Sequence, residues 1–90
     1  MTSILISGAT GSIGRALCAD ALRRGFSRVC CFSRDELKQA ELAAELNDDR
    51  MRYFLGDIRE RERLRRALEG IDFVIHAAAL KRVEAGEYNP

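Results

Sequence analysis

The stretch ILISGATGSIG, residues 4–14, joins a short apolar run to three glycines at intervals of three residues. The apolar run is typical of a buried strand, and a helical pattern follows the last glycine. Gly8 permits a sharp exit from the strand, Gly11 lets a phosphate approach the backbone, and Gly14 lets the helix pack closely on the strand. The stretch therefore predicts a phosphate-binding turn, and a glycine-rich turn without a ligand is the alternative.

Apolar runs of strand length alternate with stretches of helical period along the rest of the chain. We expect strands at 4–7, 28–32, 51–55 and 71–76, and helices at 12–24, 35–46 with Asp35 as N-cap, and 60–68. The order βαβαβαβ predicts an α/β fold with a parallel sheet and right-handed crossovers, which is a doubly wound sheet of the Rossmann type.

The same periods predict which side chains are buried. The sheet-facing residues expected in the first helix are Ile13, Ala16, Leu17 and Ala21, and one face of the second helix carries Leu37, Ala40 and Ala44. The strand at 71–76 is nearly continuous in apolar residues, as a strand covered on both faces should be. His76 at its end is interpreted as a packed, hydrogen-bonded residue rather than a catalytic one.

The composition restricts the class of protein. Hydrophobic residues make up 47% and charged residues 32% of 90 residues, which is typical of a soluble globular domain. The net charge of +1 favours neither nucleic acid nor an anionic membrane, and no apolar run reaches the roughly 20 residues of a spanning helix. We therefore expect a cytoplasmic location. Cys18, Cys30 and Cys31 are expected to be reduced packing residues, with the neighbours Cys30 and Cys31 on opposite faces of one strand.

The arginines between residues 59 and 66 alternate with glutamates and have no aromatic residues among them. We interpret this segment as a solvated helix face rather than a nucleic-acid site. The single histidine gives the cysteines no metal-binding partners, so no metal site is expected.

The end of the second strand indicates which dinucleotide the turn would bind. About 20 residues beyond the glycines, NAD-binding proteins of this fold carry an acidic residue for the ribose hydroxyls. Here Ser33 and Arg34 stand at that point, and Lys38 follows one turn into the helix. Hydroxyl and guanidinium groups suit the 2′-phosphate of NADP, so we predict NADP rather than NAD. The alternative is that Arg34 is a solvated charge and Asp35 binds the ribose.

Two later strand ends extend the expected cofactor site. Asp57 and Ile58 follow the third strand, where a short side chain reaches the adenine edge; the alternative is that Asp57 caps the next helix. Beyond the fourth strand, the small residues Ala77 and Ala79 leave room for a cofactor. Lys81 is expected to face a cofactor phosphate or an anionic substrate, with a solvated loop as its alternative.

The last two residues, Asn89 and Pro90, are typical of a helix start. We therefore expect residues 1–90 to be the N-terminal, NADP-binding portion of a longer protein, with the rest of the domain and the substrate-binding part following.

The segments SGATGSIG, FSRDELKQAE, HAAALK and EYNP together resemble the extended short-chain dehydrogenase/reductase superfamily over essentially the whole chain. The most similar branch is the nucleotide-sugar 4,6-dehydratases of polysaccharide biosynthesis, typified by the inverting UDP-N-acetylglucosamine 4,6-dehydratases. This resemblance implies that Lys81 contacts cofactor and substrate, and that NADP is held by Thr10, Gly11, Ser12, Ile13, Ser33, Arg34, Asp35, Glu36, Leu37, Lys38, Asp57, Ile58 and Ala77.

The resemblance also implies a reaction on a UDP-sugar. In this family NADP accepts hydride from the sugar C4, the 4-keto group stabilises charge at C5, water leaves across C5 and C6, and hydride returns to C6. The family's catalytic Tyr-xxx-Lys pair is missing here, because Asp57 stands four residues after Tyr53, and Tyr88 is too near residue 90. The 90 residues alone are therefore expected to be inactive.

Where relatives commonly read ALKHVP and AAEYNP, this chain has ALKRVEAGEYNP, so Arg82, Glu84 and Gly86 leave the fine substrate specificity open. Two alternatives to a dehydratase also stay open: another extended reductase or nucleotide-sugar epimerase, and a non-catalytic NADP-sensing module. A homo-oligomer is expected for the full-length protein.

Overall fold

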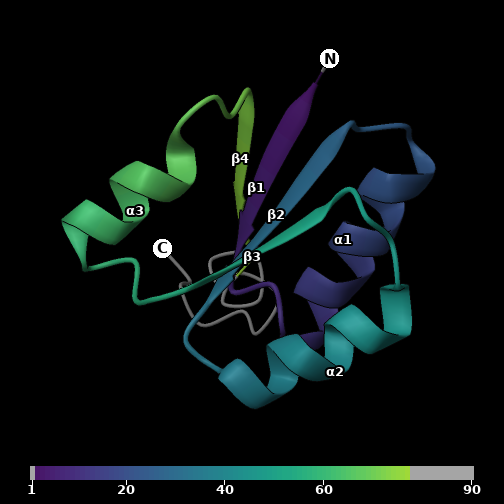
Figure 1. The fold of residues 1–90 in the computed structure, drawn as a ribbon, viewed down its shortest axis with the longest axis horizontal. Coiled ribbons are helices and arrows are strands. Elements are labelled where there is room, and N and C mark those ends of the chain that lie inside the picture. Colours follow the sequence, from purple (N-terminus) through teal and green to yellow (C-terminus); the bar gives the residue numbers. More distant parts are fainter. Residues whose placement is uncertain (1, 78–90) are drawn as a thin grey trace, which may run out of the picture.

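The computed structural model describes residues 2–77. Within this range the elements are β1 (Ser3–Ser7), α1 (Ser12–Arg23), β2 (Arg28–Ser33), α2 (Glu36–Leu46), β3 (Met51–Leu55), α3 (Arg61–Leu68) and β4 (Phe73–His76). The strands form one parallel sheet in the order β3-β2-β1-β4 (Figure 1). The predicted element order and the Rossmann-type fold are confirmed, and the predicted ends of the elements differ from the observed ones by at most two residues.

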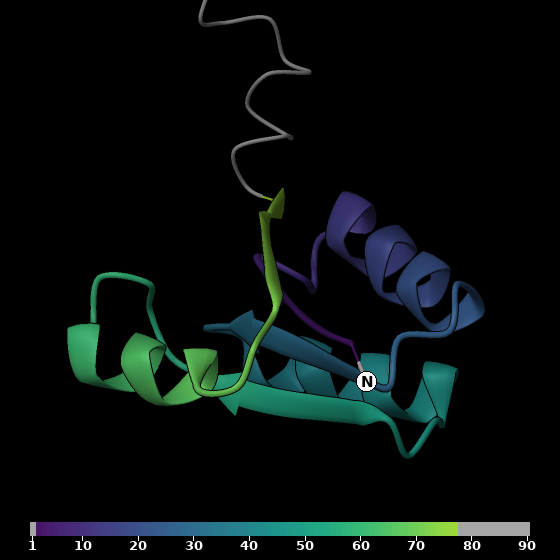
Figure 2. The ribbon, with the colours of Figure 1, turned by 90° about the horizontal axis from the view of Figure 1, so that it is seen from above.

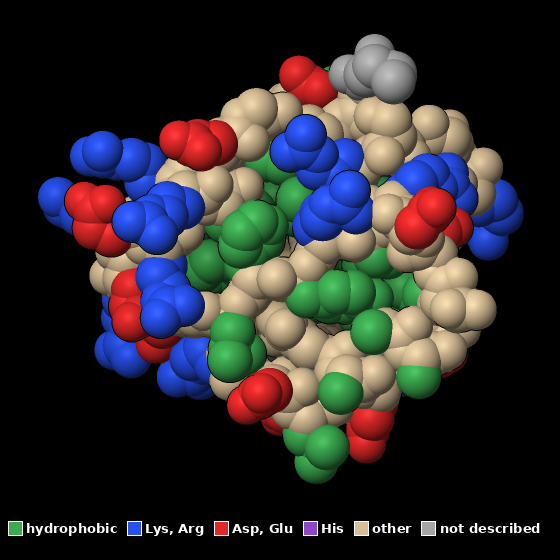
Figure 3. Space-filling model, viewed as in Figure 1, with side chains coloured by type: hydrophobic (Ala, Val, Ile, Leu, Met, Phe, Trp, Pro, Cys, Tyr) green, Lys and Arg blue, Asp and Glu red, His purple; other side chains and the backbone are tan. Residues whose placement is uncertain are grey.

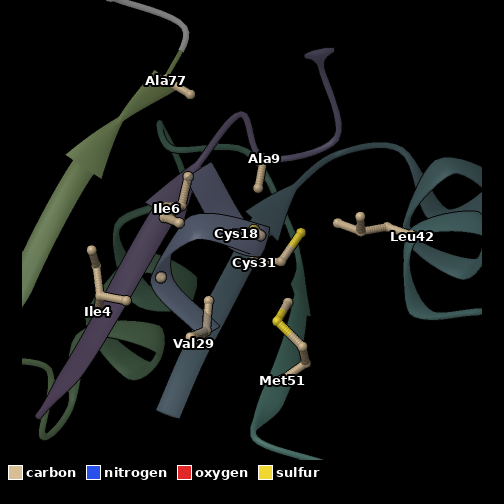
Figure 4. Packing of buried hydrophobic residues seen from close by; sticks show 10 residues of the cluster. Ile4, Ile6, Ala9, Cys18, Val29, Cys31, Leu42, Met51 and Ala77 are labelled. Atoms are coloured by element: carbon tan, nitrogen blue, oxygen red, sulfur yellow. The ribbon is translucent and has the colours of Figure 1, made fainter. Parts of the chain in front are cut away.

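Helices pack on both faces of the sheet. In both views α3 lies across the sheet from α1, and α2 lies on the same side as α1 (Figure 1 and Figure 2). Because successive strand residues face opposite ways, Cys31 packs with Cys18 and Leu42 under α1 and α2 (Figure 4), whereas Cys30 packs with Ala67 of α3. The three cysteines are free and buried, so their prediction as packing residues is confirmed.

The predicted face of α2 is wrong. Leu37 is 69% exposed, and Ala40 and Ala44 are exposed as well. The buried residues of this helix are Gln39 and Leu42. A polar residue therefore occupies the buried stripe, so the spacing of apolar residues alone does not identify this face.

The predicted face of α1 is correct in part. Ala21 is buried, and Ile13 and Leu17 are partly buried against the core. Ala16 is exposed, and the central positions belong to Gly14 and Cys18.

The strand β4 lies at one edge of the described sheet and pairs with β1. Phe73 and Val74 are 55% and 56% exposed, although the rings of Phe73 and Phe26 meet at nearly a right angle, with centroids 6.2 Å apart. Residues 2–77 thus leave both faces of this strand exposed in part, and its coverage on both faces stays a prediction.

The surface over α3 is rich in charge of both signs. Figure 3 shows Lys and Arg side chains gathered there with Asp and Glu among them, and the arginines from 59 to 66 are all exposed. This agrees with a solvated face for the helix residues 61–66, whereas Arg59 precedes the helix. None of the helices in the described part of the chain has the length and apolar character needed to cross a membrane.

Candidate functional site

The three glycines of the first turn meet different physical demands. Gly8 has φ of +69°, a left-handed conformation that favours glycine. A Cβ on Gly14 would lie 2.4 Å from the Cα of Ala9, so α1 can approach the turn only because residue 14 is glycine. A Cβ on Gly11 would lie 3.7 Å from its nearest neighbour, the Gly8 carbonyl oxygen, which is an ordinary contact. The protein's own packing therefore requires glycine at positions 8 and 14, whereas the bare backbone at Gly11 leaves space for a ligand.

The start of α1 has backbone N–H groups without a hydrogen-bond partner among residues 2–77. Gly11 is the N-cap, it contributes no side-chain hydrogen bond, and the first turn has no acidic residue. The first amide with a backbone partner is that of Arg15, which donates to the Gly11 carbonyl at 2.9 Å. The amides of Ser12, Ile13 and Gly14 have no such partner within residues 2–77. Free amides and the positive end of a helix dipole together attract an anion such as a phosphate.

A cleft of about 820 Å³ opens beside this turn, where the strands end. Doubly wound folds bind ligands at this carboxyl edge of the sheet. Eight of its lining residues were predicted from the sequence: Gly8, Thr10, Ser33, Arg34, Asp35, Glu36, Asp57 and Ile58. Four others were not: Phe32, Gly56, Arg59 and His76.

The other predicted residues that the structure describes do not line the cleft. Gly11 is the N-cap of α1, and Ser12, Ile13 and Gly14 form its first turn, two to four residues after the lining residue Thr10. Leu37 and Lys38 are exposed on the first turn of α2, and Ala77 is buried in the core cluster. Ala79 and Lys81 lie outside the described residues, as do the positions of the expected helix start at Asn89 and Pro90.

Ser33, at the end of β2, is held by a side chain that sequence reasoning missed. The side-chain nitrogen Nε2 of Gln39 lies 3.0 Å from Ser33 Oγ and 2.8 Å from the carbonyl oxygen of Phe54 on β3. Gln39 and Ser33 are only 8% and 7% exposed. A glutamine on an otherwise apolar helical stripe was the signal in the sequence, because a buried amide needs hydrogen-bond partners.

Asp57, after β3, is surrounded by arginine. Its carboxylate accepts hydrogen bonds from the backbone N–H of Arg59 and from the Arg59 guanidinium, both at 2.9 Å, and Arg34 Nη1 lies at 3.4 Å. The hydrogen bonds from the Arg59 side chain and backbone, with a smaller contribution from Arg34, lower the pKa of Asp57 to about 2. Asp57 is therefore a carboxylate at neutral pH.

Asp57 does not cap α3, so that alternative is wrong. The helix begins at Arg61 with Glu60 as its N-cap. The Asp57 N–H donates to the Glu60 carboxylate, and the Glu60 N–H donates to the Asp57 carbonyl oxygen, both at 2.8 Å. These bonds stabilise the turn before the helix and leave the Asp57 side chain in the cleft.

Asp35 is the N-cap of α2, as predicted. Its side chain accepts a hydrogen bond from the Lys38 backbone N–H at 3.0 Å. The Asp35 and Asp57 carboxylates of the cleft thus both have donors within the protein, which limits their repulsion of an anionic ligand.

Among residues 2–77, His76 and Tyr53 have few hydrogen-bond partners. His76 Nδ1 is hydrogen-bonded to Ser7 Oγ, as expected for a structural histidine, but its side chain is exposed rather than packed. Burial raises the pKa of Tyr53 to about 12, and its hydroxyl has no hydrogen-bond partner among the described residues. A phenol with a raised pKa is poorly suited to proton transfer near neutral pH.

Comparison with known proteins assigns the chain to a family. The sequence model of a family described as polysaccharide biosynthesis protein matches residues 4–90. The chain belongs to this polysaccharide biosynthesis protein family. This member of the family is 49% identical over 89 residues to UDP-N-acetylglucosamine 4,6-dehydratase (inverting) of Campylobacter jejuni, an alignment that covers 98% of the chain and 27% of the relative. It is also 37% identical over 92 residues to UDP-glucose 4-epimerase of Rickettsia conorii, with the same coverage. The resemblance expected from the sequence motifs is confirmed.

Solved structures of similar sequence share the fold of this member of the polysaccharide biosynthesis protein family. The X-ray structure of Pen from Bacillus thuringiensis is 39% identical, with a TM-score of 0.77, and the match covers 81% of this chain and 23% of that one. An oxidoreductase of the short-chain dehydrogenase/reductase family from Burkholderia thailandensis is 31% identical, with a TM-score of 0.73 and coverages of 81% and 30%. Among the curated relatives named above, the chain spans about a quarter of their length.

Proposed function

We propose that this chain is the NADP-binding N-terminal portion of a nucleotide-sugar 4,6-dehydratase, a lyase that acts on UDP-N-acetylglucosamine or a similar UDP-sugar in surface polysaccharide biosynthesis. The observation that carries the cofactor assignment is that Ser33 and Arg34 line one cleft with Gly8 and Thr10 of the turn that leads into the uncapped start of α1. The choice of a dehydratase rests on the 49% identity to the Campylobacter jejuni enzyme, against 37% to the epimerase of Rickettsia conorii.

The residues of the cleft fit a dinucleotide. The amides at the start of α1 would bind the pyrophosphate, and the bare backbone at Gly11 would let it approach. Ser33 and Arg34 would bind the 2′-phosphate, and Asp57 would accept a hydrogen bond from the adenine amino group. Bound NADP would supply a reversible hydride acceptor for the sugar, and Ala79 and Lys81 would lie toward that end of the site.

Arg34 is available for a phosphate despite its contact with Asp57. Its side chain is 73% exposed, and the two charged groups are 3.4 Å apart. An exposed pair at this distance contributes little to stability. A 2′-phosphate carries more negative charge than a carboxylate and can accept two hydrogen bonds from one guanidinium, so it would compete for Arg34.

The cofactor assignment is tested by titrating the full-length protein that carries this segment with NADP and NAD. We expect NADP to bind at least about tenfold more tightly, because one additional charge-assisted hydrogen bond corresponds to that ratio. Arg34→Ala should reduce the ratio, whereas Arg61→Ala, on the exposed surface of α3, should not. Equal affinities of the wild type for the two cofactors would refute the assignment.

The reaction is tested by incubating the same protein with UDP-N-acetylglucosamine and detecting a 4-keto sugar. A dehydratase forms this product with loss of water, and its absence would refute the proposed substrate. An epimerase remains the second candidate, favoured by the Rickettsia relative, and would give an isomer of the substrate with unchanged mass. Binding of NADP without turnover of any UDP-sugar would favour the NADP-sensing module. The cytoplasmic location and the homo-oligomer stay predictions.

A further inference from the structure

Gln39 is a buried polar residue in a position that packing alone would give to an apolar one. It shares the sheet-facing side of α2 with Leu42 and is 8% exposed. Burial of an amide is costly unless its groups are hydrogen-bonded. A methionine of similar length would fill this space without that cost. The hydrogen bonds of the Gln39 amide are therefore what distinguish glutamine from methionine here.

The partners of Gln39 determine the direction of each hydrogen bond. The Phe54 carbonyl oxygen can only accept, so the side-chain atom 2.8 Å from it must be the nitrogen Nε2. The same nitrogen lies 3.0 Å from Ser33 Oγ and donates its second hydrogen there. Both hydrogens of the amide are then used, and Ser33 Oγ is an acceptor in this bond.

This leaves the proton of the Ser33 hydroxyl free. Within residues 2–77 the hydroxyl has no acceptor of its own, and Ser33 lines the cleft. A hydroxyl has one hydrogen to donate, so Ser33 presents a donor to a ligand in the cleft. A phosphate oxygen is an acceptor at every position, whereas a ribose hydroxyl also brings a hydrogen that must be placed.

We infer that Gln39 is a positioning residue for cofactor selectivity: by donating to Ser33 Oγ it directs the serine hydroxyl hydrogen toward the 2′-phosphate of the dinucleotide. This inference rests on the proposed function, because it takes NADP as the ligand. Gln39 itself does not line the cleft and acts only through Ser33.

The test uses two small probes that differ only in the relevant group, 2′,5′-ADP and 5′-AMP. Their affinities for the full-length protein are measured by calorimetry for the wild type, Gln39→Met, Ser33→Ala and the double variant. Glu41→Met, which places the same side chain at an exposed position of α2, is the matched control. Thermal unfolding of each variant is followed in parallel.

We expect the wild type to bind 2′,5′-ADP at least about tenfold more tightly than 5′-AMP, since the phosphate adds a charge-assisted hydrogen bond. Gln39→Met should lower this ratio by about three- to tenfold with 5′-AMP affinity unchanged, and Glu41→Met should leave the ratio as in the wild type. The double variant should have the ratio of Ser33→Ala alone, because residues that act through one another are not additive. Gln39→Glu, which can only accept from Ser33 when ionised, should lower the ratio at least as far as Gln39→Met.

Each other outcome overturns a specific statement. A wild-type ratio of one refutes the NADP assignment, and the role of Gln39 with it. A normal wild-type ratio that Gln39→Met preserves refutes only the role of Gln39. Equal weakening of both probes with a lower melting temperature identifies Gln39 as purely structural, and full additivity in the double variant shows that it does not act through Ser33.

Discussion

Gly14→Ala and Gly11→Ala should have different consequences, although both glycines belong to one turn. The first substitution should lower the stability of the fold, and the second should weaken dinucleotide binding. At Gly14 the new Cβ would lie 2.4 Å from Ala9 Cα and 2.6 Å from both the Ala9 carbonyl carbon and the Gly8 carbonyl oxygen. Ordinary van der Waals contact begins at 3.4 Å, so the gap must widen by about 1 Å. The neighbouring atoms are all backbone, and the change therefore has to displace the turn or α1 itself.

The expected loss of stability for Gly14→Ala follows from two opposing terms. Overpacking of a well-packed site costs about 1–3 kcal/mol, and rigid backbone neighbours place this site at the upper end. Alanine is favoured over glycine inside a helix by about 1 kcal/mol. We therefore expect a net loss of about 2 kcal/mol in the free energy of unfolding, measured by urea titration with circular dichroism.

Gly11→Ala is the matched comparison. Its Cβ would meet only the Gly8 carbonyl oxygen at 3.7 Å, and the backbone there is extended, with φ of −75° and ψ of 173°. Stability should change by about 1 kcal/mol or less. Dinucleotide affinity should fall at least about tenfold, because the methyl group would stand between the ligand and the amides of the helix. Equal stability of the two variants, or unchanged affinity in Gly11→Ala, would refute this division of roles.

Three further predictions concern stability and titration. Asp35→Ala should cost about 1 kcal/mol in urea unfolding, because it removes the cap bond to the Lys38 amide. The hydrogen bonds from the Arg50 side chain and backbone lower the pKa of Asp48 from 3.8 to about 2, so the folded state binds this proton less readily than the unfolded state. Stability should therefore fall as pH drops from about 4 to 2, and Asp48→Asn should flatten that fall in acid titrations. Burial raises the pKa of Cys18 and Cys31 from 9.0 to about 12, so the folded state keeps these protons longer, and the free energy of unfolding should decrease between pH 9 and 12. In the folded protein both thiols should also resist a thiol reagent at about pH 8 that labels them after denaturation.

The strands and the phosphate-binding turn could be predicted because their signals are local. The run before Gly8 and the spacing of the glycines specify a strand, a turn and a helix within a few residues, and the structure has them there. The role of Asp35 as N-cap was equally local, since its partner is the amide three residues later.

The features that sequence reasoning missed depend on contacts between distant segments. Gln39 was passed over because its partners lie on β2 and β3, and only the folded sheet brings Ser33 and Phe54 together. Arg59 was assigned to a solvated face, although it lines the cleft and binds Asp57. An aspartate two residues before an arginine was the available signal, but the same pair also occurs in turns without any site.

The start of α1 attracts anions through peptide groups alone, and this determines how the two parts of the cleft respond to acid. Residues 8–14 contain no ionisable side chain, so the field that would hold a pyrophosphate there does not change between weakly acidic and weakly alkaline solution. A phosphate monoester, by contrast, takes up a proton at about pH 6. Discrimination between NADP and NAD at this cleft would therefore decline in mild acid, whereas binding of the pyrophosphate that both cofactors share would persist. Acidity would change the cofactor selectivity without releasing the cofactor.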